Sequence, residues 1–262
     1  IGIGYGALDA NTTASYSIGI GRDALGSSTT AGNNVAIGHD ALATTTTGGG
    51  NTAVGRYALR AATAALNTAI GYNALELLTT GTQNTAVGAY ALDNITTGNT
   101  CTAVGYQTLN NNTASNNSAF GSTALSTNTT GAQNCAFGHA ALVTNSTGSD
   151  NTAIGYIALY SNTTGAQNTS LGREALHLNT TANHGTALGY RALYSNTTGQ
   201  NNTAVGSKSL RLSTTGDEST AIGYLSLENA TTGQYNTCVG ARSGDAITTG
   251  NYNTALGRMA LS

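Results

Sequence analysis

The sequence predicts an all-β protein, a parallel β-solenoid (β-roll) of about sixteen coils with 17 residues per coil. Three observations lead to this prediction. A phrase such as NTAIGYIALYSNTTGAQ, residues 151–167, recurs along the whole chain. Within it, a large apolar residue before a glycine and a leucine four residues after that glycine hardly vary. The remainder is rich in Asn, Thr and Gly, which form turns.

The repeat is defined here by its anchor glycine, which precedes two variable residues and usually Ala-Leu. The anchor glycines are Gly4, Gly21, Gly38, Gly55, Gly71, Gly88, Gly105, Gly121, Gly138, Gly155, Gly172, Gly189, Gly206, Gly223, Gly240 and Gly257. Thirteen of the fifteen spacings are 17 residues and two are 16. We therefore expect residues 1–262 to be one repetitive segment. Because both ends lie inside a phrase, we also expect it to be an excerpt of a longer array.

The first element of each coil is expected to be a short strand, such as Thr152-Ala153-Ile154. The residue before the anchor glycine is always Ile, Val, Leu or Phe (the apolar column), and the residue before that is always small (the small column). Two large apolar residues in 17 give no 3.6-residue stripe, and Gly, Thr and Asn are poor helix formers. Extended backbone followed by a tight turn at Gly155 fits this pattern better.

The second half of each coil is expected to be a turn, as at residues 162–165, Asn-Thr-Thr-Gly. The two 16-residue copies are the only ones in which Thr-Thr becomes Thr-Ala, at 63–64 and 113–114, so length varies in the turn. In a solenoid, each recurrent position becomes a ladder along the axis. The Asn and Thr positions therefore predict side-chain hydrogen bonds from coil to coil.

The pattern leads us to expect the apolar column and the leucine column inside the coil. The small column has two interpretations. It lies in a narrow core, or it forms an outer face kept flat so that another chain can approach. Its candidate inter-chain members are Ala53, Ala69, Ala86, Ala103, Ala119, Ala136, Ala153, Ala204 and Ala221.

Composition excludes several classes of partner. Only 8% of the residues are charged and the net charge is −2, so no basic surface points to nucleic acid or to an anionic membrane. No apolar run approaches the roughly 20 residues of a membrane-spanning helix. We expect no nucleic-acid partner and no membrane span.

No catalytic or metal-binding pattern is present. Cys101, Cys135 and Cys238 each replace a recurrent Asn, Thr or Ala, and their separation predicts no disulfide within the chain. The four histidines have no carboxylate at a spacing typical of a triad or a metal site. We expect no enzyme activity, no metal and no cofactor.

One column could bind something. The position directly after the anchor glycine is variable and rich in Tyr and Arg, which could stack on glycans or contact a surface. The alternative is that it is merely solvated or lies beside a neighbouring chain. The candidate contact row is Tyr5, Arg22, Arg56, Tyr72, Tyr106, Tyr156, Arg173, Tyr190, Tyr224 and Arg258.

The core Asn-Thr-Ala-Val-Gly-x-x-Ala-Leu, and especially Val35-Ala36-Ile37-Gly38, resembles the repeat of YadA-like adhesin heads. The form with Asn-Thr-Thr-Gly is similar to repeats of phage tail fibres and of secreted bacterial surface proteins. The resemblance implies a left-handed β-roll that assembles as a homotrimer and is displayed outside the cell. The 17-residue coil is longer than that of the adhesin heads, so higher cyclic numbers stay open. The resemblance also favours the small column as the inter-chain face.

The expected function is therefore the shaft or head segment of an extracellular attachment fibre, a bacterial surface appendage or a phage tail fibre. Its expected partners are other copies of itself and the surface or glycans of a target cell. One alternative is an ice-binding solenoid, which would need a flat Thr-rich face. Another is an acyltransferase of the left-handed β-helix class, which Val54 to Leu59 fits for only one hexapeptide of a coil.

Overall fold

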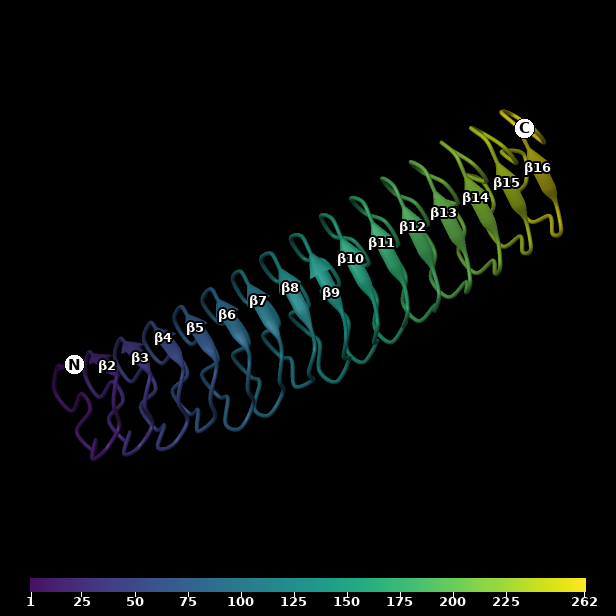
Figure 1. Ribbon diagram of the computed structural model, residues 1–262. Helices are drawn as coiled ribbons and strands as arrows, with labels where there is room; N and C mark the ends of the chain where they lie inside the picture. Colours follow the sequence, from purple (N-terminus) through teal and green to yellow (C-terminus); the bar gives the residue numbers. More distant parts are fainter. The chain divides into compact units, whose positions relative to one another are not determined.

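The computed structural model describes all residues from Ile1 to Ser262 and contains strands but no helix. The chain divides into two compact units, Ile1–Thr130 and Gly131–Ser262. Each unit is a parallel β-solenoid in which one sequence repeat forms one coil (Figure 1). The predicted all-β solenoid fold is thereby confirmed.

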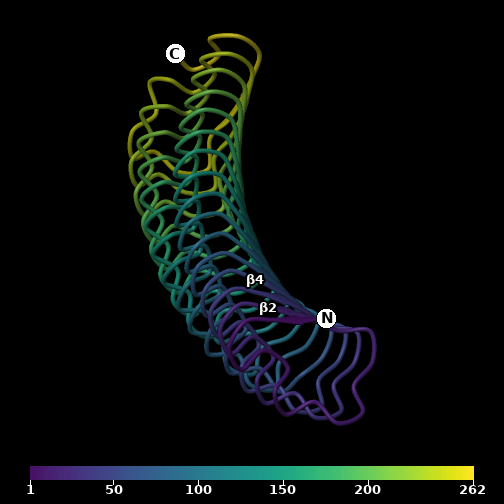
Figure 2. The ribbon, with the colours of Figure 1, turned by 90° about the vertical axis from the view of Figure 1, so that its left-hand side faces the viewer.

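Each coil contributes one short strand, and consecutive strands pair in parallel and in register within a unit. In the first unit the strands are β1 (Gly2–Ile3), β2 (Ile18–Ile20), β3 (Val35–Ile37), β4 (Thr52–Val54), β5 (Thr68–Ile70), β6 (Thr85–Val87), β7 (Thr102–Val104) and β8 (Ser118–Phe120). In the second they are β9 (Cys135–Phe137), β10 (Thr152–Ile154), β11 (Thr169–Leu171), β12 (Thr186–Leu188), β13 (Thr203–Val205), β14 (Thr220–Ile222), β15 (Thr237–Val239) and β16 (Thr254–Leu256). In the first unit, β2 and β4 lie on the same side of the stacked coils (Figure 2).

The anchor glycines have a backbone conformation that residues with a side chain rarely adopt. Their φ angles lie between 116° and 140°, outside the regions open to other residues. A Cβ on Gly88 would lie 2.3 Å from the carbonyl oxygen of Gly105, the next anchor glycine. The anchor position is therefore invariant because the stacked turns leave no room for a side chain.

Left-handed backbone is not confined to glycine. The fifteen leucines of the leucine column have φ between 47° and 57°, and the second residue after each anchor glycine is left-handed as well. This conformation costs roughly 1–2 kcal/mol for an ordinary residue. Hydrogen bonds between coils offset that cost, such as the one from the amide of Leu159 to the carbonyl of Ala175 at 2.9 Å.

The core is narrow and is filled by the leucine column on one side and the small column on the other. Leu92 and Leu159 are fully buried, and so are Ala86 and Ala153. The prediction that the leucines lie inside is confirmed. Since a leucine already spans this narrow interior, the opposing strand has room only for alanine, glycine, serine or cysteine.

The predicted position of the apolar column is wrong. Ile37, Ile154 and Leu171 keep 39%, 38% and 46% of their surface exposed, and the remaining members are half-buried or exposed. In a three-residue strand the middle side chain points to one face and its two neighbours to the other. Because the small residue in the middle points inward, the apolar residue after it points outward.

The same alternation overturns the interpretation of the small column as an inter-chain face. Its nine candidate alanines, from Ala53 to Ala221, have no exposed surface within a single chain. No second chain can therefore contact them while the coil is folded. The other interpretation, a narrow core, is the correct one.

The predicted polar ladders are present. In the second unit the side-chain amide of Asn162 donates to that of Asn145, and Asn179 donates to Asn162, both at 2.8 Å. The turn threonines also link coils, as Thr163 Oγ1 donates to the carbonyl of Thr180 at 3.0 Å. These bonds satisfy amides that would otherwise be unpaired in a buried position.

Candidate functional site

Two surfaces carry the features from which a function can be argued. The first, named here the strand face, consists of the outward side chains of the strands. Each strand offers its first and third residues, which in most coils are a threonine and a member of the apolar column. The threonines are Thr52, Thr68, Thr85 and Thr102 in the first unit and Thr152, Thr169, Thr186, Thr203, Thr220, Thr237 and Thr254 in the second.

The strand face has no charged residue in either unit. Neighbouring coils repeat it at about 4.8 Å, and the two outward residues of one strand are about 6.7 Å apart. Exposed apolar side chains at such regular spacing make a regular and partly apolar surface. Surfaces of this kind on soluble proteins mark contacts with a partner.

The second surface, named the corner segment, comprises the five residues that follow each anchor glycine. All nine Lys and Arg residues of the chain and ten of its thirteen Tyr lie in these segments. The strands and the Thr-rich turns contain no Lys or Arg. The coil therefore places its cations and most of its aromatic rings along one edge of each unit.

All ten members of the predicted contact row lie in this edge and are exposed. The structure brings some of them together. The guanidinium carbon of Arg173 lies 5.6 Å from the ring centre of Tyr156 and 6.0 Å from that of Tyr190. In the first unit Arg56 lies over Tyr72 at 6.0 Å. Four members have no ring contact with another member of the row, namely Tyr5, Arg22, Tyr224 and Arg258.

Reasoning from the sequence missed the second and fifth positions of the corner segment. In the second unit Tyr160, His177 and Tyr194 occupy the fifth position of consecutive coils, and their rings stack with centres 5.2 Å and 5.1 Å apart. In the first unit Tyr57 and Tyr90 occupy the second position and alternate in ring contact with Tyr72 and Tyr106. The signal in the sequence was the confinement of every cation to these five positions.

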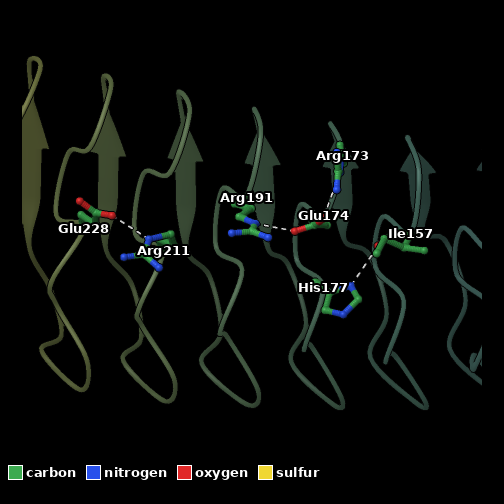
Figure 3. A network of polar contacts seen from close by, with 7 residues as sticks. All are labelled: Ile157, Arg173, Glu174, His177, Arg191, Arg211 and Glu228. Carbon is green, nitrogen blue, oxygen red and sulfur yellow. Dashed lines mark hydrogen bonds and ion pairs between the residues drawn. The ribbon is translucent and has the colours of Figure 1, made fainter.

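A buried carboxylate organises the edge of the second unit. Glu174 has only 6% of its side chain exposed and forms ion pairs with Arg173, at 3.0 Å, and with Arg191. Figure 3 shows Glu174 between these two guanidinium groups, which come from neighbouring coils. Burial by itself would raise the pKa of Glu174, but the hydrogen bonds from Arg191 and Arg173 hold that pKa below its usual range.

The charges of the edge differ between the units. In the corner segments of the first unit, three Arg face five carboxylates, Asp9, Asp23, Asp40, Glu76 and Asp93. In those of the second unit, six Lys and Arg face three carboxylates, Glu174, Glu228 and Asp245, a net charge of +3. Burial and the neighbouring Glu76 raise the pKa of Asp93 to about 6.

A hollow of about 530 Å³ lies at the edge of the first coils. It is lined by Tyr5, Gly6, Asp9, Asp23, Gly26, Ser27, Ala43 and Thr44. A Cβ on Gly6 would lie 2.2 Å from Oδ1 of Asp23, so the Asp23 carboxylate occupies the place of a side chain at position 6. No polar side chain is buried in its wall. The hollow therefore offers no fixed polar group to orient a ligand, whereas the network around Glu174 does.

No three His, Cys, Asp or Glu side chains are arranged to hold a metal ion. The chain also contains no helix long and apolar enough to cross a bilayer. Comparisons with protein-family models, with curated proteins and with solved structures return no significant match.

Proposed function

We propose that this chain is a structural segment of an extracellular attachment fibre in which copies of the chain associate side by side through the strand face. The observation that carries the proposal is the uncharged strand face, with its exposed apolar column in coil after coil. The resemblance of the repeat to YadA-like adhesin heads and to tail-fibre repeats supports the extracellular setting and favours a trimer.

The energetics of the strand face suit a repetitive interface. Covering the exposed part of an apolar-column side chain contributes about 1 kcal/mol per coil, which is negligible in isolation. Each unit offers eight such side chains in one line, and association covers them together. The absence of charge on the strand face means that no ion has to be desolvated.

A test replaces exposed apolar residues on and off the strand face by lysine. The double variant Ile70→Lys/Leu171→Lys introduces charge into the strand face. The matched control, Leu77→Lys/Leu178→Lys, introduces the same charge at exposed leucines elsewhere, since Leu77 and Leu178 are 40% and 37% exposed. Sedimentation at micromolar concentration is expected to show an oligomer for the native chain and the control, and monomers for the strand-face variant.

A monomeric native chain, or equal dissociation of both variants, would refute association through the strand face. Far-ultraviolet circular dichroism checks that both variants keep their coils. The number of chains follows from the mass of the native species, and three is the number that the resemblance favours.

Ice binding is the second candidate, because the strand face is a regular array of threonine and aliphatic side chains. The turn threonines are poorer candidates for such a face, since Thr163 Oγ1 donates to the carbonyl of Thr180 in the next coil. The strand threonines are the better candidates. Inhibition of ice recrystallisation by the native chain, lost on Thr186→Lys/Thr203→Lys, would favour this function over attachment; the attachment proposal expects no inhibition.

A further inference from the structure

The edge of the second unit combines three chemical features in neighbouring coils. Guanidinium groups, tyrosine rings and a buried carboxylate lie within a few coils of one another, on Arg173, Arg191, Tyr156, Tyr190 and Glu174. The residues of this edge do not belong to the strand face through which copies are proposed to associate.

The two arginines are held in place by Glu174, but part of each guanidinium group remains available to a ligand. Glu174 accepts from the Nε atoms of both Arg173 and Arg191, and it is almost fully buried while doing so. Arg173 nevertheless keeps 61% of its side chain exposed and Arg191 keeps 36%. A guanidinium bound through Nε leaves its two terminal amino groups free to face an anion bidentately.

The rings and the cations alternate along the axis. Tyr156, Arg173 and Tyr190 occupy the same position in three consecutive coils, with the guanidinium of Arg173 between the two rings. Arg191 lies over Tyr190 at 5.1 Å and over Tyr194 at 5.3 Å. Tyr156 and Tyr190 are two coils apart, a distance of about 10 Å, which is on the order of the length of a disaccharide.

This alternation fits a linear polymer with an apolar face and a negative charge in each repeat. Tyrosine faces pack against the C–H groups of a sugar ring, and guanidinium groups bind carboxylates and sulfates with matched geometry. Lys208 and Arg211 extend the positive edge into the following coil, where Arg211 is paired with Glu228 at 2.7 Å (Figure 3). The net charge of +3 is modest, so charge alone does not explain selectivity.

We propose that the corner segments around Glu174 form a binding site for a linear anionic polysaccharide. Arg173 and Arg191 bind its carboxylate or sulfate groups, Tyr156 and Tyr190 pack on its sugar rings, and Glu174 is a positioning residue that orients both arginines. This inference rests on the proposed attachment role, for which it names the chemistry of the target.

Binding of the native 262-residue chain to a sulfated polysaccharide (heparin), a carboxylated one (polygalacturonate) and a neutral one (dextran) tests the site. Affinity electrophoresis or calorimetry at low ionic strength is expected to show binding to at least one anionic polymer and none to dextran. The two anionic polymers distinguish sulfate from carboxylate as the preferred group. Affinity is expected to fall as salt is added, because exposed charges are screened.

Two variants of equal charge locate the site. Arg173→Gln/Arg191→Gln is expected to weaken binding by about 10-fold or more, since two charge-assisted contacts are lost. Arg60→Gln/Arg242→Gln removes the same charge at positions outside the contact row and outside the Glu174 network, and is expected to leave affinity within about twofold. Equal loss in both variants would overturn the proposal in favour of unspecific attraction. Tyr190→Ala is expected to weaken binding without changing its dependence on salt.

Glu174→Gln separates an organised site from a simple positive surface. The substitution makes the edge more positive, so unspecific attraction predicts tighter binding. The proposal predicts weaker binding, because the two guanidinium groups lose the carboxylate that orients them. Thermal melts of the variants show whether the coils remain folded, and if Glu174→Gln unfolds, the comparison of the two arginine pairs decides.

Two further outcomes would overturn the proposal. One is the absence of binding to both anionic polymers, and the other is tighter binding to single-stranded DNA, whose bases also stack on aromatic rings. The result is independent of the sedimentation test. A monomeric chain that binds polysaccharide refutes the side-by-side association alone, and an oligomer that binds none refutes the site alone.

Discussion

One residue breaks the leucine column, and its surroundings show how tightly the core is filled. Gly244 stands where every other complete coil has leucine, and it keeps the left-handed φ, at 72°. The same coil has Cys238 in the small column, where all other coils have alanine, glycine or serine. A Cβ on Gly244 would lie 2.5 Å from Cys238 Sγ and 2.9 Å from a methyl of Leu227. The sulfur thus occupies part of the space that leucine fills elsewhere.

A double-mutant cycle tests this compensation. Gly244→Leu alone is expected to destabilise the chain by about 1–3 kcal/mol through overpacking. Cys238→Ala alone leaves a small cavity and is expected to cost about 1 kcal/mol. The double variant restores the leucine–alanine pair of the other coils and is expected to be more stable than Gly244→Leu. Equilibrium denaturation measures all four chains, and strict additivity would contradict the compensation.

Asp93 gives stability a dependence on pH. Its pKa in the folded chain is about 6 because it is partly buried beside Glu76, whereas an unfolded aspartate titrates near 4. The folded state therefore binds the proton more tightly. Its contribution is favourable below pH 4 and is lost as the pH rises through 6.

Asp93→Asn is expected to remove this loss. After allowance for solvent screening of a half-buried group, the gain at pH 7 is about 1 kcal/mol. No gain is expected at pH 4, where the native aspartate is already protonated. Thermal melts at the two pH values check the difference, and an equal effect at both would rule out titration of Asp93 as the cause.

At the scale of the element, the three-residue strand explains both what the sequence predicts and what it leaves open. Alternation along Thr102-Ala103-Val104 requires that the first and third side chains share a face, and the sequence shows this directly. It does not say which face is inside. That depends on the leucine column, whose side chains fill a core too narrow for a second large side chain.

The ladders and the corner segment differ in the same way. The Asn and Thr ladders follow from the recurrence of single positions, so they could be predicted. The contacts of Arg191 with Tyr190, Tyr194 and Glu174 join different positions of neighbouring coils. They depend on left-handed turns at ordinary residues such as Glu174, with φ of 59°. The conformational preferences of these residues do not predict such turns.

Neighbouring substitutions in β7 are expected to have opposite consequences. Ala103→Phe places a large ring in a filled core and is expected to destabilise the coil by about 3 kcal/mol or more. Val104→Asp lies on the strand face and is expected to cost less than about 1 kcal/mol in stability while weakening association. This reverses the effect that a buried valine would have. Denaturation and sedimentation of both variants check it, and severe unfolding by Val104→Asp alone would contradict the outward position.

For the whole molecule, we propose that each surface of the coil has a separate task. The leucine and small columns with the Asn ladders hold the coils together. As proposed above, the strand face would join copies of the chain, and the corner segments around Glu174 would bind the target. The strand face recurs in every coil, so its contacts, which are weak individually, would add along the chain.

Thiol modification of the native chain tests the central claim most directly, because its three free cysteines report on different columns. Cys238 is in the small column and Cys101 is in an Asn ladder, and both are buried; Cys135 is half-buried on the strand face. Burial raises the pKa of all three thiols, so labelling is done at alkaline pH under non-oxidising conditions, with the denatured chain as the reference.

We predict that in dilute solution Cys135 alone reacts readily, as mapped by mass spectrometry of peptides. At concentrations where the chain associates, the labelling rate of Cys135 is expected to fall, while Cys101 and Cys238 stay unreactive at both concentrations. Ready labelling of Cys238 in the folded chain would contradict the inward small column. A Cys135 rate that does not change when the oligomer forms would contradict association through the strand face.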